Sequence, residues 1–232
     1  MTRSVAAFIP ARAGSKRVPG KNLERIAGAS LLARAILSAA PCSSRTVSTD
    51  DESIAEWAEY DGADVHHRPD PLASDHAQIE AAVAHWWKRL DTKPDAVVIL
   101  QPTSPFRTAD HVREAVDLLW RTGADSVVSV TAGHEGHFAG RLKPRESEGA
   151  PAWYEWQPFR NVGETRPRTQ DLRPMGTENG AIYVFTLEHW ERTGNRMGGR
   201  MVAYPMTRWA GMDVDTPEDL EMARAIAERM GM

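Results

Sequence analysis

A buried strand that opens into a basic, glycine-rich loop is the feature that most constrains this fold. The apolar run Val5–Ile9 predicts a buried β-strand. Residues 10–22 follow it directly and contain two glycines, two prolines and four cations. Glycine lets backbone N–H groups approach oxygen atoms closely, and arginine and lysine neutralise negative charge. The stretch therefore predicts a loop that holds a nucleoside triphosphate at the end of a strand.

Strand and helix patterns alternate along the rest of the chain, which predicts a mostly parallel, doubly wound α/β sheet with helices on both faces. Ser30 is expected to cap the first helix, and Thr49 or Asp50 the second. The patterns predict strands at 45–48, 63–67, 96–100, 126–130, 180–185 and, at an edge, 200–206, with helices at 30–37, 53–60, 76–90, 111–121 and after Pro217. In such sheets ligands bind at the carboxyl ends of the strands, where loops 10–22, 49–51 and 101–107 are predicted to meet.

Residues 131–173 differ from the rest of the chain. Much of this stretch is rich in glycine, proline, arginine and aromatic residues, including Trp153, Tyr154, Trp156 and Phe159. Such a composition favours an interface, although an insertion that packs its aromatic side chains on its own domain is the alternative. We therefore expect a single domain over residues 1–232, with 131–173 as an extension for dimerisation or acceptor binding.

Composition excludes several classes of function. A net charge of −4 and a pI near 6.1 argue against general nucleic-acid binding. Cys42 is the only cysteine, so no intrachain disulfide and no cysteine zinc cluster is expected. No apolar run approaches the ~20 residues of a membrane span, and no signal peptide is expected. These features predict a cytoplasmic protein. Separately, His66 and His67 are expected at the surface or in a loop.

The opening loop does not match two common phosphate-binding motifs. Gly14 and Gly20-Lys21 lie one residue too far apart for a P-loop, and Asn22 stands where serine or threonine would bind magnesium. The dinucleotide pattern G-x-G-x-x-G is also absent. The loop therefore belongs to another class of nucleotide-binding site, unless it is a solvated basic turn.

A pair of carboxylates near the other end of the chain is a candidate metal site. Asp213 and Asp215 have the spacing of a strand, so both are expected to point to one face. Magnesium is commonly held by one or two carboxylates together with substrate phosphates, which the opening loop would supply. The alternative is a pair of solvated or capping carboxylates, with Asp215 or Thr216 capping the last helix.

Several motifs, in order along nearly the whole chain, resemble the acylneuraminate cytidylyltransferase family. The most specific is the long loop at 9–22. The others are Ser48–Asp51, Arg68-Pro69, Leu72–Asp75, Gln101–Pro105 with Arg107, Arg168 with Gln170, Asn179–Tyr183 and Asp213–Leu220.

The resemblance implies a nucleotidyltransferase fold and a homodimer in which each subunit extends an arm to its neighbour's site. It implies transfer of CMP from CTP to an acidic sugar, with magnesium as the cofactor and pyrophosphate as the second product. By motif match, Arg12, Lys21, Asp213 and Asp215 would be catalytic, and the two aspartates would hold the metal. The residues that would bind the nucleotide are Ala11, Arg12, Gly14, Ser15, Lys16, Asn22 and Arg68. The residues that would bind the acceptor are Gln101, Thr103, Ser104, Arg168 and Gln170.

The chain departs from the family pattern in the region expected to bind the acceptor. The family pattern includes a lysine that meets the acidic sugar, and this chain has no direct counterpart of it. Either Arg141 replaces this lysine or the contact is absent. The acceptor therefore stays open between an N-acylneuraminate, another nonulosonic or 2-keto sugar acid, and a phosphonate. A non-catalytic nucleotide-sugar binding module is the second hypothesis. A small-molecule kinase is the third, and the failed P-loop spacing argues against it.

Overall fold

The computed structural model describes residues 3–134, 140–145, 153–158, 168 and 174–232. It divides into two compact units, of which the second comprises Ala132–Thr177 and the first comprises the rest of the chain. Within the second unit, β8 (Gly140–Arg145) and β9 (Trp153–Pro158) form an antiparallel hairpin that was not predicted. The predicted extension at 131–173 falls almost entirely within this unit, and its Phe159 lies outside the described residues.

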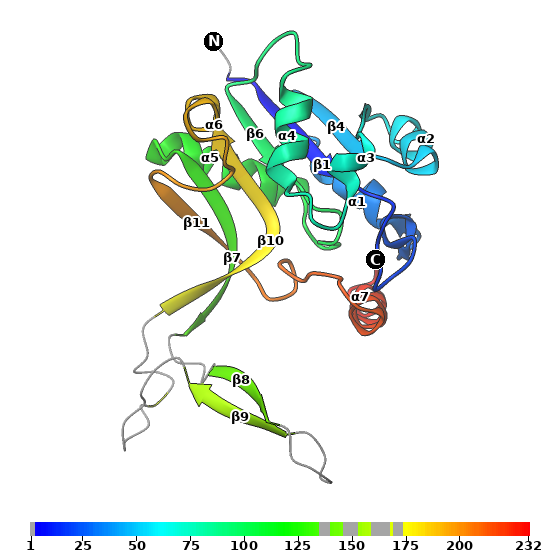
Figure 1. The fold of residues 1–232 in the computed structure, drawn as a ribbon, viewed down its shortest axis with the longest axis vertical. Coiled ribbons are helices and arrows are strands. Elements are labelled where there is room, and N and C mark those ends of the chain that lie inside the picture. The colour runs from blue at the N-terminus through cyan, green and yellow to red at the C-terminus, as the bar shows by residue number, and fades with distance from the viewer. Residues whose placement is uncertain (1–2, 135–139, 146–152, 159–167, 169–173) are drawn as a thin grey trace. The chain divides into compact units, whose positions relative to one another are not determined.

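The first unit is built on a seven-stranded sheet, which confirms the predicted mostly parallel α/β class (Figure 1). β1 pairs in parallel with β4 and β6, and β10 is antiparallel to β6. β11 lies at one edge, as the sequence predicted. The order is β11 (Met201–Met206), β7 (Ser126–His134), β10 (Pro174–Thr186), β6 (Ala96–Ile99), β1 (Val5–Pro10), β4 (Ser44–Thr49) and β5 (Asp64–His67).

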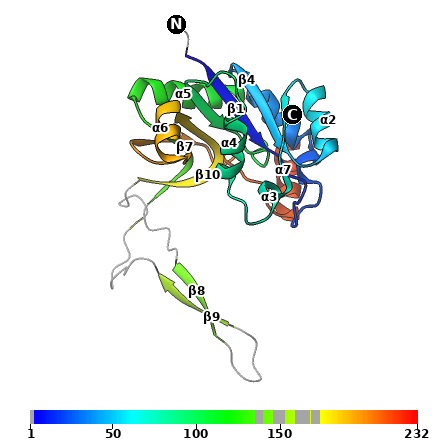
Figure 2. The ribbon, with the colours of Figure 1, turned by 45° about the horizontal axis from the view of Figure 1, so that its top comes forward.

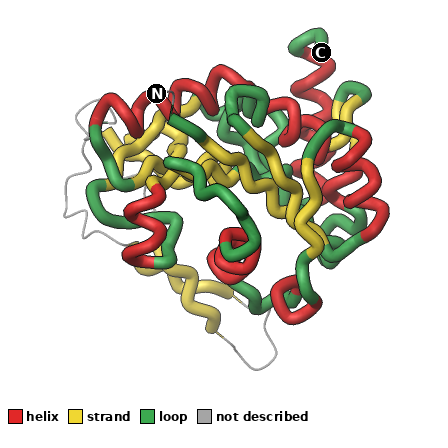
Figure 3. Tube along the Cα trace, turned by 90° about the horizontal axis from the view of Figure 1, so that it is seen from above, coloured by secondary structure: helices red, strands yellow, loops and turns green. Residues whose placement is uncertain are grey.

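Helices cover both faces of the sheet because both faces of its central strands are apolar (Figure 3). Along β1, Val5, Ala7 and Ile9 join one core and Ala6 and Phe8 the other, as the alternation of a strand requires. The first core includes residues of α1 (Leu31–Ser38), α2 (Glu52–Tyr60) and α5 (Ala109–Thr122); the second includes residues of α4 (Ile79–Trp87) and α6 (Leu187–Thr193).

A third, smaller core joins the segment after β1 to the last helix, α7 (Pro217–Arg229). Val18 belongs to it together with Val214 and Leu220, and all three are nearly inaccessible to solvent. α7 also contacts the short strand β2 (Arg25–Ile26), which pairs with β3 (Ala29–Ser30). Figures 1 and 2 show the red helix beside the blue loop that follows β1. The basic loop is therefore fixed by residues about 200 positions further along the chain.

The structure corrects several local predictions. Asp51, rather than Thr49 or Asp50, caps α2 by accepting a hydrogen bond from the Ile54 amide. The predicted helix at 76–90 is shorter and spans Ile79–Trp87. His66, expected at the surface, is 6% exposed on β5. Ser30 caps α1 as predicted. Short helices at Lys21–Leu23 (η1) and Asp70–Ala73 (α3) were not predicted. Among the described residues, no helix has the length and apolar character to cross a membrane.

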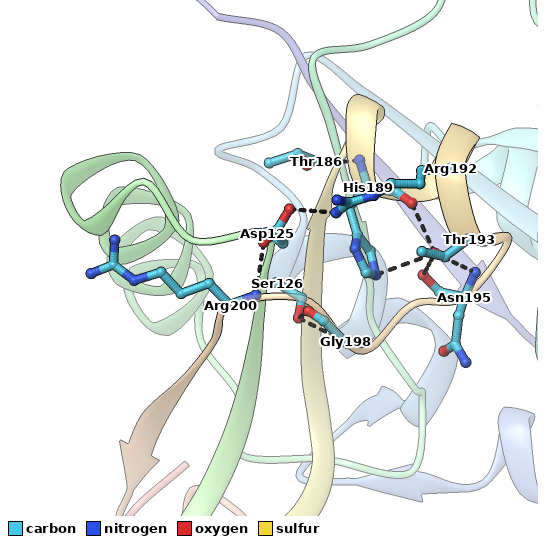
Figure 4. Close-up of polar contacts among 9 residues, drawn as sticks. All are labelled: Asp125, Ser126, Thr186, His189, Arg192, Thr193, Asn195, Gly198 and Arg200. Atoms are coloured by element: carbon cyan, nitrogen blue, oxygen red, sulfur yellow. Dashed lines mark hydrogen bonds and ion pairs between the residues drawn. The ribbon is translucent and has the colours of Figure 1, made fainter.

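A polar cluster fixes the amino end of β7 (Figure 4). The Asp125 carboxylate accepts a hydrogen bond from the Arg200 amide at 2.7 Å and pairs with Arg192 at 2.8 Å. Beside it, Ser126 Oγ exchanges hydrogen bonds with the backbone of Gly198. The hydrogen bond from Arg200 is the main cause of a pKa for Asp125 below the usual range. The Asp125 carboxylate and the Ser126 hydroxyl therefore both hold the connection between α6 and β11.

This cluster predicts a pH-dependent loss of stability. A carboxyl whose pKa is lowered in the folded state stabilises the protein above its unfolded pKa, and this stabilisation disappears as pH falls through the folded pKa. Asp125→Asn should therefore lower the melting temperature at neutral pH, and the difference from wild type should shrink below about pH 4. Asp117→Asn, at an exposed position of α5 with the same charge change, is the control. A constant difference across this pH range would contradict the assignment.

Candidate active site

A cleft of about 480 Å³ lies at the carboxyl ends of β1, β5 and β6. This volume is in the range of small-molecule and cofactor sites. The cleft therefore lies where loops 10–22 and 101–107 were predicted to meet, whereas residues 49–51, the third predicted loop, do not line it. Its lining residues are Pro10, Arg12, Ser15, Lys16, Arg17, Lys21, Asn22, Arg68, Asp75, Ala77, Ile79, Gln101, Pro102, Thr103 and Asp215.

Two cations of the basic loop are held by one carboxylate. Arg12 Nη1 lies 2.9 Å from Asp75 Oδ1, and Lys16 pairs with the other oxygen of the same carboxylate. These two hydrogen bonds are the main reason why the pKa of Asp75 is lowered. Arg12 Nη1 also donates to the Ala73 carbonyl. Asp75 therefore contacts the two side chains that are predicted to bind phosphate.

The backbone of the loop is fixed from the neighbouring strand. The Ala13 amide donates to Asp50 Oδ1 at 3.0 Å, directly after β4. Gly20 adopts a left-handed conformation, φ 67°, which favours glycine where the chain turns into η1. A Cβ built on Gly14 would meet no described atom within 4 Å, so the backbone there is open to a ligand. Ala11, also predicted to bind nucleotide, is fully buried below the loop and does not line the cleft.

Lys21 connects the loop to the carboxylate segment before α7. Its ammonium donates to the Val214 carbonyl at 2.9 Å and to Asp215 Oδ1 at 3.0 Å. Arg17 approaches the second oxygen of Asp215 at 3.4 Å. Only 12% of the Lys21 side chain is exposed, so this contact is much better shielded from solvent than the Arg17 pair. The structure thus brings together Lys21 and Asp215, two residues predicted to be catalytic.

The carboxylate pair lies directly before α7. Residues 212–215 belong to no strand of the sheet, and Val214, between the two aspartates, enters the third core. Asp215 lines the cleft, whereas Asp213 is more enclosed and its Oδ1 has no hydrogen-bond partner among the described residues. Burial raises the pKa of the Asp213 carboxyl. Thr216 is the helix cap, which leaves both aspartates free of that structural role.

Asn22 and Arg68 form the side of the cleft predicted to bind the nucleoside. Asn22 is 8% exposed and donates from Nδ2 to the Arg12 carbonyl at 2.9 Å. Arg68 follows β5 and is held by Ser48, to which Nε and Nη2 donate at 3.1 and 3.0 Å. Burial lowers the pKa of Arg68. Two polar side chains are thus held in place against the same cleft.

The loop after β6 contributes Gln101 and Thr103 to the cleft. Ser104, from the same predicted acceptor set, is 2% exposed and does not line it. Arg107, fully buried, supports this loop by donating to the carbonyls of Gln101 and Ala181. The Thr103 carbonyl accepts from the Val214 amide at 2.8 Å, so the loop is joined to the carboxylate segment.

The remaining predicted acceptor residues lie in the second unit. Arg168 is exposed, and Gln170 lies outside the described residues. Arg141, the candidate replacement for the family lysine, lies on β8. Their part in acceptor binding stays a prediction.

Two functional candidates were missing from the predicted set. Asp50 and Asp75 were each noted only as part of a motif. The position of Asp50 directly after a parallel strand was the available signal. Asp75 gave no comparable signal because its partners, Arg12 and Lys16, lie about 60 residues earlier in the chain.

The fold and cleft define an α/β protein in which a cationic loop and a carboxylate segment share one site. A model of the cytidylyltransferase family matches residues 6–137 of this chain. The chain therefore belongs to the cytidylyltransferase family.

Curated relatives include an N-acylneuraminate cytidylyltransferase of Oncorhynchus mykiss, 32% identical over 99% of this chain and 51% of the relative. One of Escherichia coli O18:K1:H7 is 30% identical over 99% of this chain and 53% of the relative. A CMP-N,N'-diacetyllegionaminic acid synthase of Legionella pneumophila is 42% identical over 55% of this chain and 57% of the relative. These matches confirm the family resemblance seen in the motifs. The chain spans about half the length of these curated relatives.

Solved structures support the fold. A CMP:2-keto-3-deoxy-manno-octonic acid synthetase complexed with CTP has a TM-score of 0.66 at 17% identity, covering 98% of this chain and 99% of that one. A 4-diphosphocytidyl-2C-methyl-D-erythritol synthase from Anaerococcus prevotii has a TM-score of 0.63 at 13% identity, with coverages of 98% and 99%. At these identities the likeness concerns the fold alone.

The Asp75 contacts predict competition between this carboxylate and phosphate. Asp75→Asn should tighten the binding of pyrophosphate several-fold, because Arg12 and Lys16 then lose no ion pair when the anion binds. The expected gain is small, since exposed ion pairs contribute about 0–1 kcal/mol. Titration calorimetry at fixed salt measures it, with Asp70→Asn, at an exposed position of α3, as the charge-matched control. Weaker binding by Asp75→Asn alone would instead mean that Asp75 orders the loop for its ligand.

Proposed function

We propose that this protein is a magnesium-dependent cytidylyltransferase that transfers CMP from CTP to an acidic sugar and releases pyrophosphate. The observation that carries the proposal is the meeting, in one cleft, of the cationic loop with Asp215. A protein that only bound nucleotide would need the cations but not the carboxylate. The motif matches and the named relatives favour cytidine and an acidic nonulosonic acid, such as an N-acylneuraminate.

The proposed reaction requires positioning and charge neutralisation more than covalent chemistry. A hydroxyl oxygen of the acceptor attacks the α-phosphorus of CTP, the bond to the β-phosphate oxygen breaks, and the hydroxyl proton passes to solvent. Arg12, Ser15 and Lys16 would hold the triphosphate, and Arg12 and Lys21 would neutralise the departing pyrophosphate. Asn22 and Arg68 would orient the cytidine, and Gln101 and Thr103 would face the acceptor.

The carboxylates present fit a magnesium ion. Asp213 Oδ1 is a buried acceptor without a hydrogen-bond partner among the described residues, and Asp215 presents a second carboxylate at the cleft. No group of three or more metal-ligating side chains occurs in the part of the chain that the structure describes. Two carboxylates suffice for magnesium when substrate phosphates complete the ligand set. The bound ion would supply charge neutralisation at the α-phosphate and lower the pKa of the acceptor hydroxyl.

Because Asp215 already pairs with Lys21 and Arg17, it must release or share these cations when metal binds.

The proposed magnesium requirement predicts that EDTA abolishes turnover and that added Mg²⁺ restores it. Activity that is unchanged after exhaustive chelation would contradict the metal assignment.

The acceptor is tested by incubating the protein with each nucleoside triphosphate, Mg²⁺ and a panel of acidic sugars, and measuring pyrophosphate. Release that requires both CTP and one acceptor is the expected result. The panel should include N-acylneuraminates, legionaminic acid, a 2-keto-3-deoxy sugar acid and a phosphonate, because the named relatives differ in their sugar. Release of orthophosphate would favour a kinase or phosphatase. Nucleotide binding without turnover on any acceptor would favour the non-catalytic module.

Asp215→Ala tests the role of the carboxylate. Turnover should fall by roughly 10²–10³-fold or more, the loss typical of removing a charge that stabilises the transition state. The melting temperature should change little, because Asp215 is partly exposed and Thr216 is the helix cap. Glu218→Ala, exposed in the first turn of α7, is the control and should retain turnover. Unfolding of Asp215→Ala would instead assign this residue a structural role.

The resemblance also leads us to propose a cytoplasmic homodimer in which residues 131–173 reach the neighbouring site. The single free thiol of Cys42 fits a reducing compartment. Light scattering on the purified chain measures the oligomeric state. A monomer with full turnover would contradict the shared-site part of the proposal.

A further inference from the structure

A continuous chain of hydrogen bonds extends from Arg68 into the protein, away from the cleft. Arg68 Nε donates to Ser48 Oγ at 3.1 Å, and Ser48 Oγ lies 2.9 Å from His66 Nδ1. His66 Nε2 in turn lies 2.7 Å from His85 Nδ1. Arg68, Ser48 and His66 are 9%, 0% and 6% exposed, so most of the chain is shielded from water. Only Arg68 among these four residues lines the cleft.

The chemistry of the donors fixes the direction of every bond in this chain. An arginine guanidinium only donates hydrogen bonds, so Ser48 Oγ must accept from Arg68. Ser48 is fully buried, and His66 Nδ1 is the one acceptor for its hydroxyl proton among the described residues, so that proton is directed toward His66. His66 Nδ1 must then be an acceptor, which requires the neutral imidazole with its proton on Nε2. That proton is donated to His85 Nδ1. Neutral His66 in one tautomer is therefore the only form that satisfies the whole chain.

The surroundings of His66 favour this neutral form. Burial is the main cause of a pKa lowered to about 4, and His85, Arg68, Arg89 and His67 add to it because all are cationic when charged. No carboxylate contributes to this shift. The rings of Phe8 and His85 pack against the imidazole at centroid distances of 6.3 and 5.0 Å. The hydrogen-bond geometry and the surrounding charges therefore both favour the neutral form of His66.

We propose that His66 is a positioning residue that fixes the Arg68 guanidinium for the nucleotide. The inference rests on the proposed function, because it assigns the cytidine nucleotide as the ligand of Arg68. Ser48 occupies Nε and Nη2 of Arg68, which leaves Nη1 as the guanidinium nitrogen without a hydrogen bond to the described residues. By accepting the Ser48 proton, His66 holds the Ser48 lone pairs toward Arg68. His66 thus determines which N–H groups of the Arg68 guanidinium point to the cleft, without touching the ligand itself.

The test compares two substitutions at the same position. His66→Leu removes the acceptor for Ser48, whereas His66→Asn can place an amide oxygen where Nδ1 now lies. His66→Leu should weaken CTP binding roughly ten-fold, the order expected when a buried group loses its partner. It should raise KM for CTP by the same factor and leave kcat nearly unchanged. His66→Asn should stay within about two-fold of wild type. His67→Leu, the exposed neighbour on β5, is the matched control.

Binding is measured by calorimetry on variants whose melting curves show that they are folded. A folded His66→Leu that binds CTP like wild type overturns the inference and leaves the proposed function intact. Wild-type protein that does not bind CTP overturns the proposed function, and with it the ligand of Arg68. The second readout is the ¹⁵N spectrum of the histidines near neutral pH, where His66 should be neutral and protonated on Nε2. A proton on Nδ1 would overturn the inference directly, and so would failure of His66→Asn to restore binding in a folded variant.

Discussion

The Lys21 ammonium, held by the Val214 carbonyl and the Asp215 carboxylate, is the contact on which the site depends. It joins the basic loop after the first strand to the segment before the last helix, 193 residues further along the chain. The third core lies beside it, where Val18 and Val214 are buried together. The apolar contacts fix the distance between the two segments, and the charged contact fixes which side chains face the cleft. Neither segment alone contains both the cations and the carboxylate that the proposed transfer needs.

Two further cations of the cleft also lie opposite a carboxylate. Asp75 neutralises Arg12 and Lys16, and Asp50 accepts from the backbone of the same loop. A loop with four cations would repel itself without these partners, so the carboxylates stabilise it before a ligand arrives. On binding the proposed triphosphate, the loop would exchange one set of anionic partners for another. This exchange would limit the affinity for the triphosphate.

Much of the fold could be predicted because its signals are local. The apolar run at Val5–Ile9 and the alternating helices are readable from short windows, and so is the serine cap at Ser30. The mostly parallel sheet followed from their order.

Side-chain partners that lie far apart in the chain could not be predicted in this way. His66 looks polar and superficial in sequence, yet β5 places it against α4, where only tertiary structure supplies a neighbour such as His85. The spacing of Asp213 and Asp215 and the cations of the opening loop predicted from chemistry that the two segments share a site. The Lys21–Asp215 contact itself was not predicted, because its partners lie 194 residues apart.

The distance along the chain between the loop and α7 has a consequence for synthesis. A ribosome adds about 5–20 residues each second, so the basic loop is made roughly 10–40 s before Val214 and Leu220 exist to pack against Val18. During that interval the growing chain carries its cations without the carboxylate and the apolar partners that complete the cleft. The proposed competence to bind nucleotide would therefore arise only after α7 has been made, later than the synthesis of the central strands. The packing of α7 thus makes the proposed activity depend on two segments that are synthesised at well separated times.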